Sequence, residues 1–205
     1  MIKQLQHPFF VIMGPSGSGK TAITSKVFPK NYKVISHTTR KKRLDEVDGV
    51  DYYFETKASF QTLIETNQLV EYDFYHGNYY GVGVAAIVET TKEHPAYNAL
   101  TFPGFQAVFE RFGESVIPVF FDVSKENIYQ RLKQRESDPK IIEERLNLYD
   151  QEILIKNQLE QYPNYQRIDA NGPIKEVAGL LQECTIINQA TGETESNINF
   201  VLLGA

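Results

Sequence analysis

A short segment rich in glycine and serine, closed by a lysine and a threonine, has the spacing of a phosphate-binding loop. Residues 14–21 read Gly14-Pro15-Ser16-Gly17-Ser18-Gly19-Lys20-Thr21 and match the pattern G-x-x-x-x-G-K-[ST] in full. Glycines let backbone N–H groups turn inward on a polyphosphate, and a following helix presents its positive end to the same anion. Lys20 is expected to reach the terminal phosphates and Thr21 to bind the magnesium ion. The alternative is a glycine-rich turn that contains a lysine by chance.

The elements around this loop favour the first interpretation. An apolar run, 8–13, precedes the loop, and a segment with helical character, 21–28, follows it. Apolar runs and amphipathic segments then alternate along the chain, which predicts an α/β fold with a parallel sheet flanked by helices. We expect strands at 8–13, 32–36, 96–102, 116–121 and 165–170. We expect helices at 21–28, 83–92, 105–112, 125–135, 140–159 and 174–184.

The segment 37–81 interrupts the alternation and is rich in tyrosine and phenylalanine. It contains strand-like pieces at 51–54 and 69–72 and a short helix at 58–65, so we interpret it as a small inserted α+β lobe. Residues 1–36 and 82–184 then form the core, which includes a polar, charged lid at about 135–145. The tail, 185–205, is predicted to be a flexible connector that ends in a docked strand at 200–203.

Bulk composition excludes several classes of protein. A chain of 205 residues with 41% hydrophobic and 23% charged residues suits one globular domain with inserted lobes. The net charge of −5 argues against a nucleic-acid partner. No run approaches the ~20 apolar residues of a membrane span, and the single cysteine, Cys184, forms no internal disulfide. We therefore expect a cytoplasmic protein with neither nucleic-acid nor membrane partners.

A second group of residues suits anion binding. Residues 36–43 place Arg40, Arg43 and two lysines directly after an expected strand, and Tyr52, Glu71 and Tyr80 follow downstream. Arginine forks and tyrosine hydroxyls suit a second phosphate, and a glutamate beside them can bind the edge of a nucleobase. Each residue taken alone also fits a solvated basic turn or a core aromatic.

Together these residues resemble the guanylate kinase family. The family pattern S-x-T-T-R-x-x-R-x-x-E-x-x-G-x-D-Y-x-F is matched by Ser36, Thr38, Thr39, Arg40, Arg43, Glu46, Gly49, Asp51, Tyr52 and Phe54. The pattern E-x-x-x-x-x-G-N-Y-Y-G is matched by Glu71, Gly77, Asn78, Tyr79, Tyr80 and Gly81. The phosphate loop agrees as well, and the resemblance spans roughly residues 8–184. It implies a P-loop NTPase-type parallel sheet with a lid, in which 37–81 is the lobe that binds the nucleoside monophosphate.

The resemblance also implies an activity in purine nucleotide metabolism: transfer of the γ-phosphoryl group of ATP, bound with Mg²⁺, to GMP. It assigns Glu71 to guanine N1 and N2, and Arg135 and Arg145 to clamping the transferring group. It implies a monomer or homodimer. Arg131 is a further candidate for phosphate, but pairing with Glu126 or Asn127 on the helix surface explains it equally well. The GMP phosphate is assigned to Ser36, Arg40, Arg43, Tyr52 and Tyr80.

Several positions depart from the family pattern. Where the family has D-x-D-x-Q-G, this chain has 102–107 with Phe102 and Gly104 in place of the two aspartates. The serine or threonine after N-Y-Y-G, which contacts the guanine O6 side in the family, is Val82, and the glycine of the lid hinge is Glu136. Asp122, at the end of a later strand, is a weak substitute for a magnesium-side acid, because its strand follows the one that should carry the acid; capping the next helix explains it better.

Three functions remain open from the sequence. The first is a guanylate kinase that is slow or has relaxed base selection. The second is a related kinase that acts on another small phosphate ester. The third is a non-catalytic guanylate-kinase-like module that binds a nucleotide or protein. The retained Lys20 and Thr21 argue against the third function, and the lost aspartates argue for it.

Overall fold

The structure is a computed structural model that describes residues 4–75, 77–136 and 138–201; the side chains of 75, 135 and 189–201 lie outside this description. The chain divides into two compact units. One comprises Met1–Phe10 and Asn31–Val116, and the other comprises Val11–Lys30 and Ile117–Ala205. No helix in the described ranges combines the length and the apolar character needed to cross a membrane.

A four-stranded parallel sheet carries the phosphate loop, in the order β6-β1-β7-β8. Its strands are β1 (Phe9–Met13), β6 (Ala96–Ala99), β7 (Val116–Asp122) and β8 (Gln166–Asp169). β7 and β8 run parallel, from Val119 opposite Gln166 to Asp122 opposite Asp169. Every residue of β1 is buried, as expected for a strand covered on both faces. The predicted α/β fold with a helix-flanked parallel sheet is confirmed.

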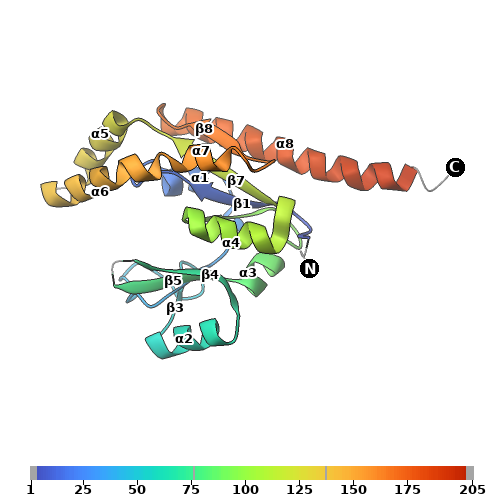
Figure 1. Ribbon diagram of the computed structural model, residues 1–205, viewed down its shortest axis with the longest axis horizontal. Helices are drawn as coiled ribbons and strands as arrows, with labels where there is room; N and C mark the ends of the chain where they lie inside the picture. Colours follow the sequence, from blue (N-terminus) through green and yellow to red (C-terminus); the bar gives the residue numbers. More distant parts are fainter. Residues whose placement is uncertain (1–3, 76, 137, 202–205) are drawn as a thin grey trace. The chain divides into compact units, whose positions relative to one another are not determined.

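Five helices belong to the unit that contains the loop. They are α1 (Lys20–Val27), α5 (Lys125–Arg135), α6 (Pro139–Glu152), α7 (Ile155–Leu159) and α8 (Ile174–Val201). α8 packs on α1, and α6 packs on α5 (Figure 1). The single helix predicted at 140–159 is two helices, interrupted at residues 153–154. Ser124 caps α5 by accepting a hydrogen bond from the Asn127 N–H, so the capping role considered for Asp122 was wrong.

The expectation for the C-terminal tail was also wrong. Residues 188–199 are helical rather than a flexible connector, and residues 200–201 end α8 rather than opening a strand. Val177 and Leu181, in the first turns of α8, are buried. Once this part has formed, each added residue extends the helix at low cost, because only nucleation is expensive. Residues 202–205 lie outside the described ranges.

The other unit contains a second sheet, in the order β3-β2-β5-β4. Its strands are β2 (His37–Thr38), β3 (Tyr53–Phe54), β4 (Leu69–Tyr75) and β5 (Asn78–Gly83). The same unit holds helices α2 (Lys57–Glu65), α3 (Val84–Thr90) and α4 (Phe102–Phe112). Short 3-10 helices lie at Lys30–Tyr32 and Gly113–Ser115.

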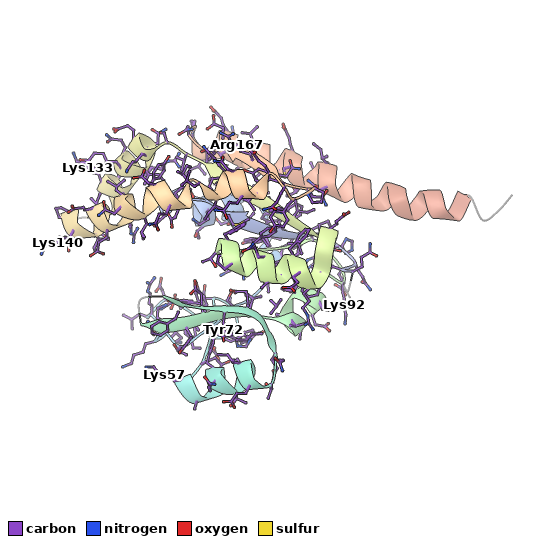
Figure 2. All side chains as sticks on the ribbon, in the orientation of Figure 1. Lys57, Tyr72, Lys92, Lys133, Lys140 and Arg167 are labelled. Carbon is purple, nitrogen blue, oxygen red and sulfur yellow. The ribbon has the colours of Figure 1, made fainter. Side chains whose placement is uncertain are left out.

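The second sheet has two different faces, because successive side chains of a strand point to opposite sides. On one face Phe60 of α2 stacks on Tyr79 at 5.3 Å between ring centroids and meets Tyr72 edge-on at 6.5 Å; Figure 2 labels Tyr72 on β4. Glu71, one residue earlier, therefore belongs to the opposite face, where it approaches Gly104 of α4. Val82 and Tyr80 are paired with Glu71 and Asp73 and share this second face.

Two expected strands differ in extent. The strand expected at 32–36 is reduced to one bridge, between Lys33 and Tyr97. The strand expected at 96–102 stops at Ala99, and α4 begins at Phe102. The Thr101 hydroxyl accepts the Gly104 N–H at 3.3 Å, and Pro103 lies in the first turn, which together favour a helix start here. Phe102, which stands where the family has its first aspartate, therefore lies on a helix.

Candidate active site

The phosphate loop joins β1 to α1 in a backbone conformation that requires glycine. Gly14 and Gly19 have φ of +143° and +94°. A Cβ on Gly14 would lie 2.8 Å from the Phe121 carbonyl oxygen, so a side chain has no room there. Gly19 precedes α1 and offers no side-chain cap, and the buried Ser18 Oγ has no hydrogen-bond partner in the described part of the chain. An uncapped helix start and an orphaned hydroxyl both suit a bound polyphosphate.

Lys20 is the first residue of α1 and folds back over the loop. Its Nζ donates to the carbonyl oxygens of Gly14 at 2.6 Å and Pro15 at 3.1 Å. Burial lowers the pKa of Lys20 from 10.5 to about 8, and the negative charge of Glu152 partly opposes this. Burial therefore disfavours the charged form of Lys20, and a charge in this position interacts strongly with an approaching anion.

Arg131 supports the loop from α5. Its guanidinium donates to the carbonyl oxygens of Ser18 at 3.0 Å and Ala170 at 2.6 Å. Glu126 instead accepts from Gln130, so the proposed surface pairing of Arg131 was wrong. The Arg131 guanidinium also donates to the Gly172 carbonyl. The three carbonyls belong to loops that are distant from Arg131 in the sequence, so the sequence signal for this role was weak.

The residues present suit a metal ion held mainly by phosphate oxygens. Thr21 is exposed in the first turn of α1, so its hydroxyl is open to a ligand at the loop. Asp122 is engaged instead by Lys156 at 3.2 Å and by Arg167 of β8, labelled in Figure 2. Within the described ranges no three His, Cys, Asp or Glu side chains gather into a metal site. The donor set thus fits Mg²⁺ bound together with a triphosphate.

The two lid arginines lie on different helices. Arg145 is half-buried on α6. Arg135 is the last residue of α5, and its side chain lies outside the described part of the chain. Glu136 ends α5 in an extended conformation, with its N–H bonded to the Leu132 carbonyl at 2.8 Å. A non-glycine residue is thus accommodated without strain at the position of the family's hinge glycine.

In the other unit, Arg40, Tyr52 and Tyr80 come together. The Arg40 guanidinium lies 5.4 Å from the centre of the Tyr52 ring, and the Tyr52 and Tyr80 rings meet edge-on at 6.1 Å. Glu46 binds both Arg40 Nη atoms, at 2.6 and 3.0 Å, and this pairing lowers the pKa of Glu46 to about 2. The Arg40 guanidinium therefore already binds one carboxylate through two nitrogens, the geometry in which arginine binds an anion with two oxygens.

Ser36 and Arg43 are placed differently from this cluster. Ser36 is buried and its hydroxyl accepts from Asn98 Nδ2 at 2.9 Å, while Arg43 lies in an exposed loop. The sequence reasoning missed Lys33. Its Nζ lies 5.3 Å from the centre of the Tyr52 ring and donates to the Asp51 carbonyl at 3.3 Å. Lys33 lies outside the family pattern that begins at Ser36, so the sequence did not indicate that its side chain reaches Tyr52.

Glu71 is a half-buried carboxylate on the same face of the small sheet as Tyr80. Burial, aided by the like charge of Asp73, raises the pKa of Glu71 from 4.5 to about 7. A Cβ on Gly104 would lie 2.9 Å from Glu71 Oε2, so glycine allows the close approach of this carboxylate to α4. Val82, opposite Glu71 in the sheet, is 1% exposed and provides no hydrogen-bonding group. Glu71 is therefore a polar group in largely apolar surroundings.

The parallel α/β sheet, the glycine loop after β1 and the lysine and threonine at the start of α1 define a P-loop protein of the nucleotide-kinase class. The family model described as guanylate kinase matches residues 6–184, and the chain belongs to the guanylate kinase family. Membership makes it a nucleotide kinase, of a family that generally uses ATP with a divalent metal ion.

Two solved structures share the fold. A guanylate kinase from Anaplasma phagocytophilum is 23% identical, with a TM-score of 0.63, over 92% of this chain and 89% of that one. A gluconokinase from Sinorhizobium meliloti 1021 is 14% identical, with a TM-score of 0.54, over 95% of this chain and 99% of that one. At these identities each likeness shows the fold alone.

Proposed function

We propose that the chain transfers the γ-phosphoryl group of ATP, bound with Mg²⁺, to GMP, and thereby forms ADP and GDP. The observation that carries this proposal is the cluster of Arg40, Tyr52 and Tyr80 on a sheet face that also presents Glu71. An arginine fork with two tyrosines suits the acceptor phosphate, and a buried carboxylate nearby suits the edge of guanine. Residues 37–81 are then the acceptor lobe.

The roles of the remaining residues follow from charge. Lys20 holds the terminal donor phosphates, together with the amides of residues 14–21, and Thr21 contributes its hydroxyl to the metal ion. The metal ion, when bound, screens phosphate charge and orients the phosphates. Arg135 and Arg145 stabilise the charge that spreads over the equatorial oxygens during transfer. Ser36 and Arg43 complete the set proposed for the acceptor phosphate.

Base selection is expected to rest on Glu71 in its ionised form. An ionised carboxylate accepts from guanine N1 and N2, but it opposes the unprotonated N1 of adenine. Loss of such a charge-assisted pair costs about 1.5–3 kcal/mol, or roughly one to two powers of ten in preference. Because Val82 and Gly104 add no polar side chain, we expect slower turnover or weaker base selection than the full family pattern would provide.

The same departures support a second candidate, a kinase of the same type that acts on another small phosphate ester. In that case the Arg40 cluster is retained for the phosphate and the base contacts are not used. A non-catalytic binding module is disfavoured, because Lys20 and its contacts within the loop are intact.

The test measures ADP release from Mg-ATP with GMP, dGMP, AMP, CMP, UMP and sugar phosphates as acceptors. The proposal expects GMP-dependent turnover that disappears in Lys20→Ala and Glu71→Ala. The control is Glu89→Gln, which changes an exposed ion pair with Lys92. Turnover with a different acceptor alone would establish the second candidate. GMP binding without turnover on any acceptor would refute both kinase proposals.

A further inference from the structure

We propose that Glu152, the last residue of α6, is a positioning residue that holds the phosphate loop and links it to the helix that carries Arg145. This inference rests on the proposed phosphoryl transfer and adds to it a residue outside the sequence motifs. The contact joins positions 136 residues apart: the Ser16 N–H donates to Glu152 Oε2 at 2.9 Å. Hydrogen bonds within the loop, and one from Arg131 to the Ser18 carbonyl, also hold it.

The bonded amide is well placed to fix the shape of the loop. Pro15 has no N–H, so Ser16 is the first residue after Gly14 whose amide can be held from outside. Ser18 N–H closes the next turn on the Pro15 carbonyl at 3.0 Å. A carboxylate bound to the Ser16 amide therefore anchors the open side of the loop, and a bond to a charged acceptor is about twice as strong as a neutral one.

The end of α6 that carries Glu152 is itself anchored. Tyr149 donates its hydroxyl proton to the Val123 carbonyl at 2.8 Å, and Asp150 pairs with Lys125 at 2.7 Å. Arg145 precedes Glu152 by seven residues, which places both on one helix face about 10 Å apart along the axis. Glu152 thus connects the phosphate loop to a helix end that is already held in place, on the same helix as Arg145.

The experiment measures binding of a non-hydrolysable Mg-ATP analogue to the full chain by calorimetry. Glu152→Ala, Glu152→Gln and the control Glu144→Gln, an exposed site on the same helix, are compared. We expect Glu152→Ala to lose about tenfold in affinity or more. We expect Glu152→Gln, which keeps an acceptor for the Ser16 amide, to retain most of the wild-type affinity. The control should follow the wild type.

The kinetic readout separates loop positioning from a general structural role. If GMP turnover is present, Glu152→Ala should raise KM for ATP and lower kcat, because the loop that holds the donor phosphates is displaced, and Glu152→Gln should restore most of both. Wild-type affinity in Glu152→Ala, or equal losses in the Ala and Gln variants, would overturn the proposal. A wild-type chain that binds the analogue but transfers nothing to GMP would refute the acceptor assignment and leave this inference standing. Absence of analogue binding by the wild type would refute both.

Discussion

Replacement of Glu71 with glutamine should stabilise the folded chain while it removes the group proposed to bind guanine. In the folded chain the pKa of Glu71 is about 7, raised from 4.5 by burial and by the like charge of Asp73. A raised pKa means that the ionised carboxylate is less favourable in the folded state than in the unfolded one. Glutamine has nearly the same shape and carries no charge.

The raised pKa of Glu71 sets the size of the stability change and its dependence on pH. Below about pH 4.5 the carboxyl is protonated in both states and contributes no penalty. As the pH rises from 4.5 through 7, the unfolded chain ionises first, so the free energy of unfolding falls. Each pKa unit corresponds to about 1.4 kcal/mol, so the penalty above pH 7 reaches up to about 3 kcal/mol. Glu71→Gln is expected to recover much of this lost free energy of unfolding at pH 8.5 and little of it at pH 4.5.

The assay is urea unfolding of the wild type and Glu71→Gln at pH 4.5, 6 and 8.5, with the GMP-dependent rate measured on the same preparations. The stability difference should grow with pH while the rate with GMP falls by a factor of ten or more. Glu65→Gln, an exposed change on α2, is the control. A stability difference that does not depend on pH would refute the argument that burial of the charge is the cause.

Three further predictions concern the loop and α4. Since the pKa of Lys20 is about 8, ATP affinity should weaken by up to tenfold per pH unit above 8, and Lys20→Arg should lack this dependence in a calorimetric titration. Gly104→Ala should displace the Glu71 carboxylate and raise KM for GMP about tenfold without lowering the melting temperature, because alanine favours helix; an unchanged KM would contradict this. Arg131→Met should cost about 2–4 kcal/mol in urea unfolding by leaving loop carbonyls unpaired, and a loss under 1 kcal/mol would refute that role.

Local signals predicted the elements whose pattern is strong. The apolar runs at β1 and β7 are short-range features, so these strands appear where the pattern places them, and α5 occupies the range expected for it. Errors arose where tertiary context overrides local preference. The strand expected at 32–36 lacks a continuous partner, and the polar tail continues as helix because α8 is already nucleated against α1.

The candidate site shows the same division. The order Gly14 to Thr21 and the motifs around Arg40 and Glu71 are written in the sequence, because the chemistry needs these residue types at fixed spacing. The contacts of Arg131 with loop carbonyls, of Lys33 with Tyr52 and of Glu152 with the Ser16 amide join distant positions. No local pattern encodes such pairs.

By itself, the sequence determined the family, the phosphate loop and the identity of the groups available for chemistry. Only the tertiary structure decided how those groups are tuned. It pairs Asp122 with Lys156 and Arg167, and it places Glu71 against Gly104. It also brings the Glu152 carboxylate of α6 to the Ser16 amide of the phosphate loop. The physical reason is that charge, solvation and pKa depend on what surrounds a side chain in space, and most of those neighbours are remote along the chain.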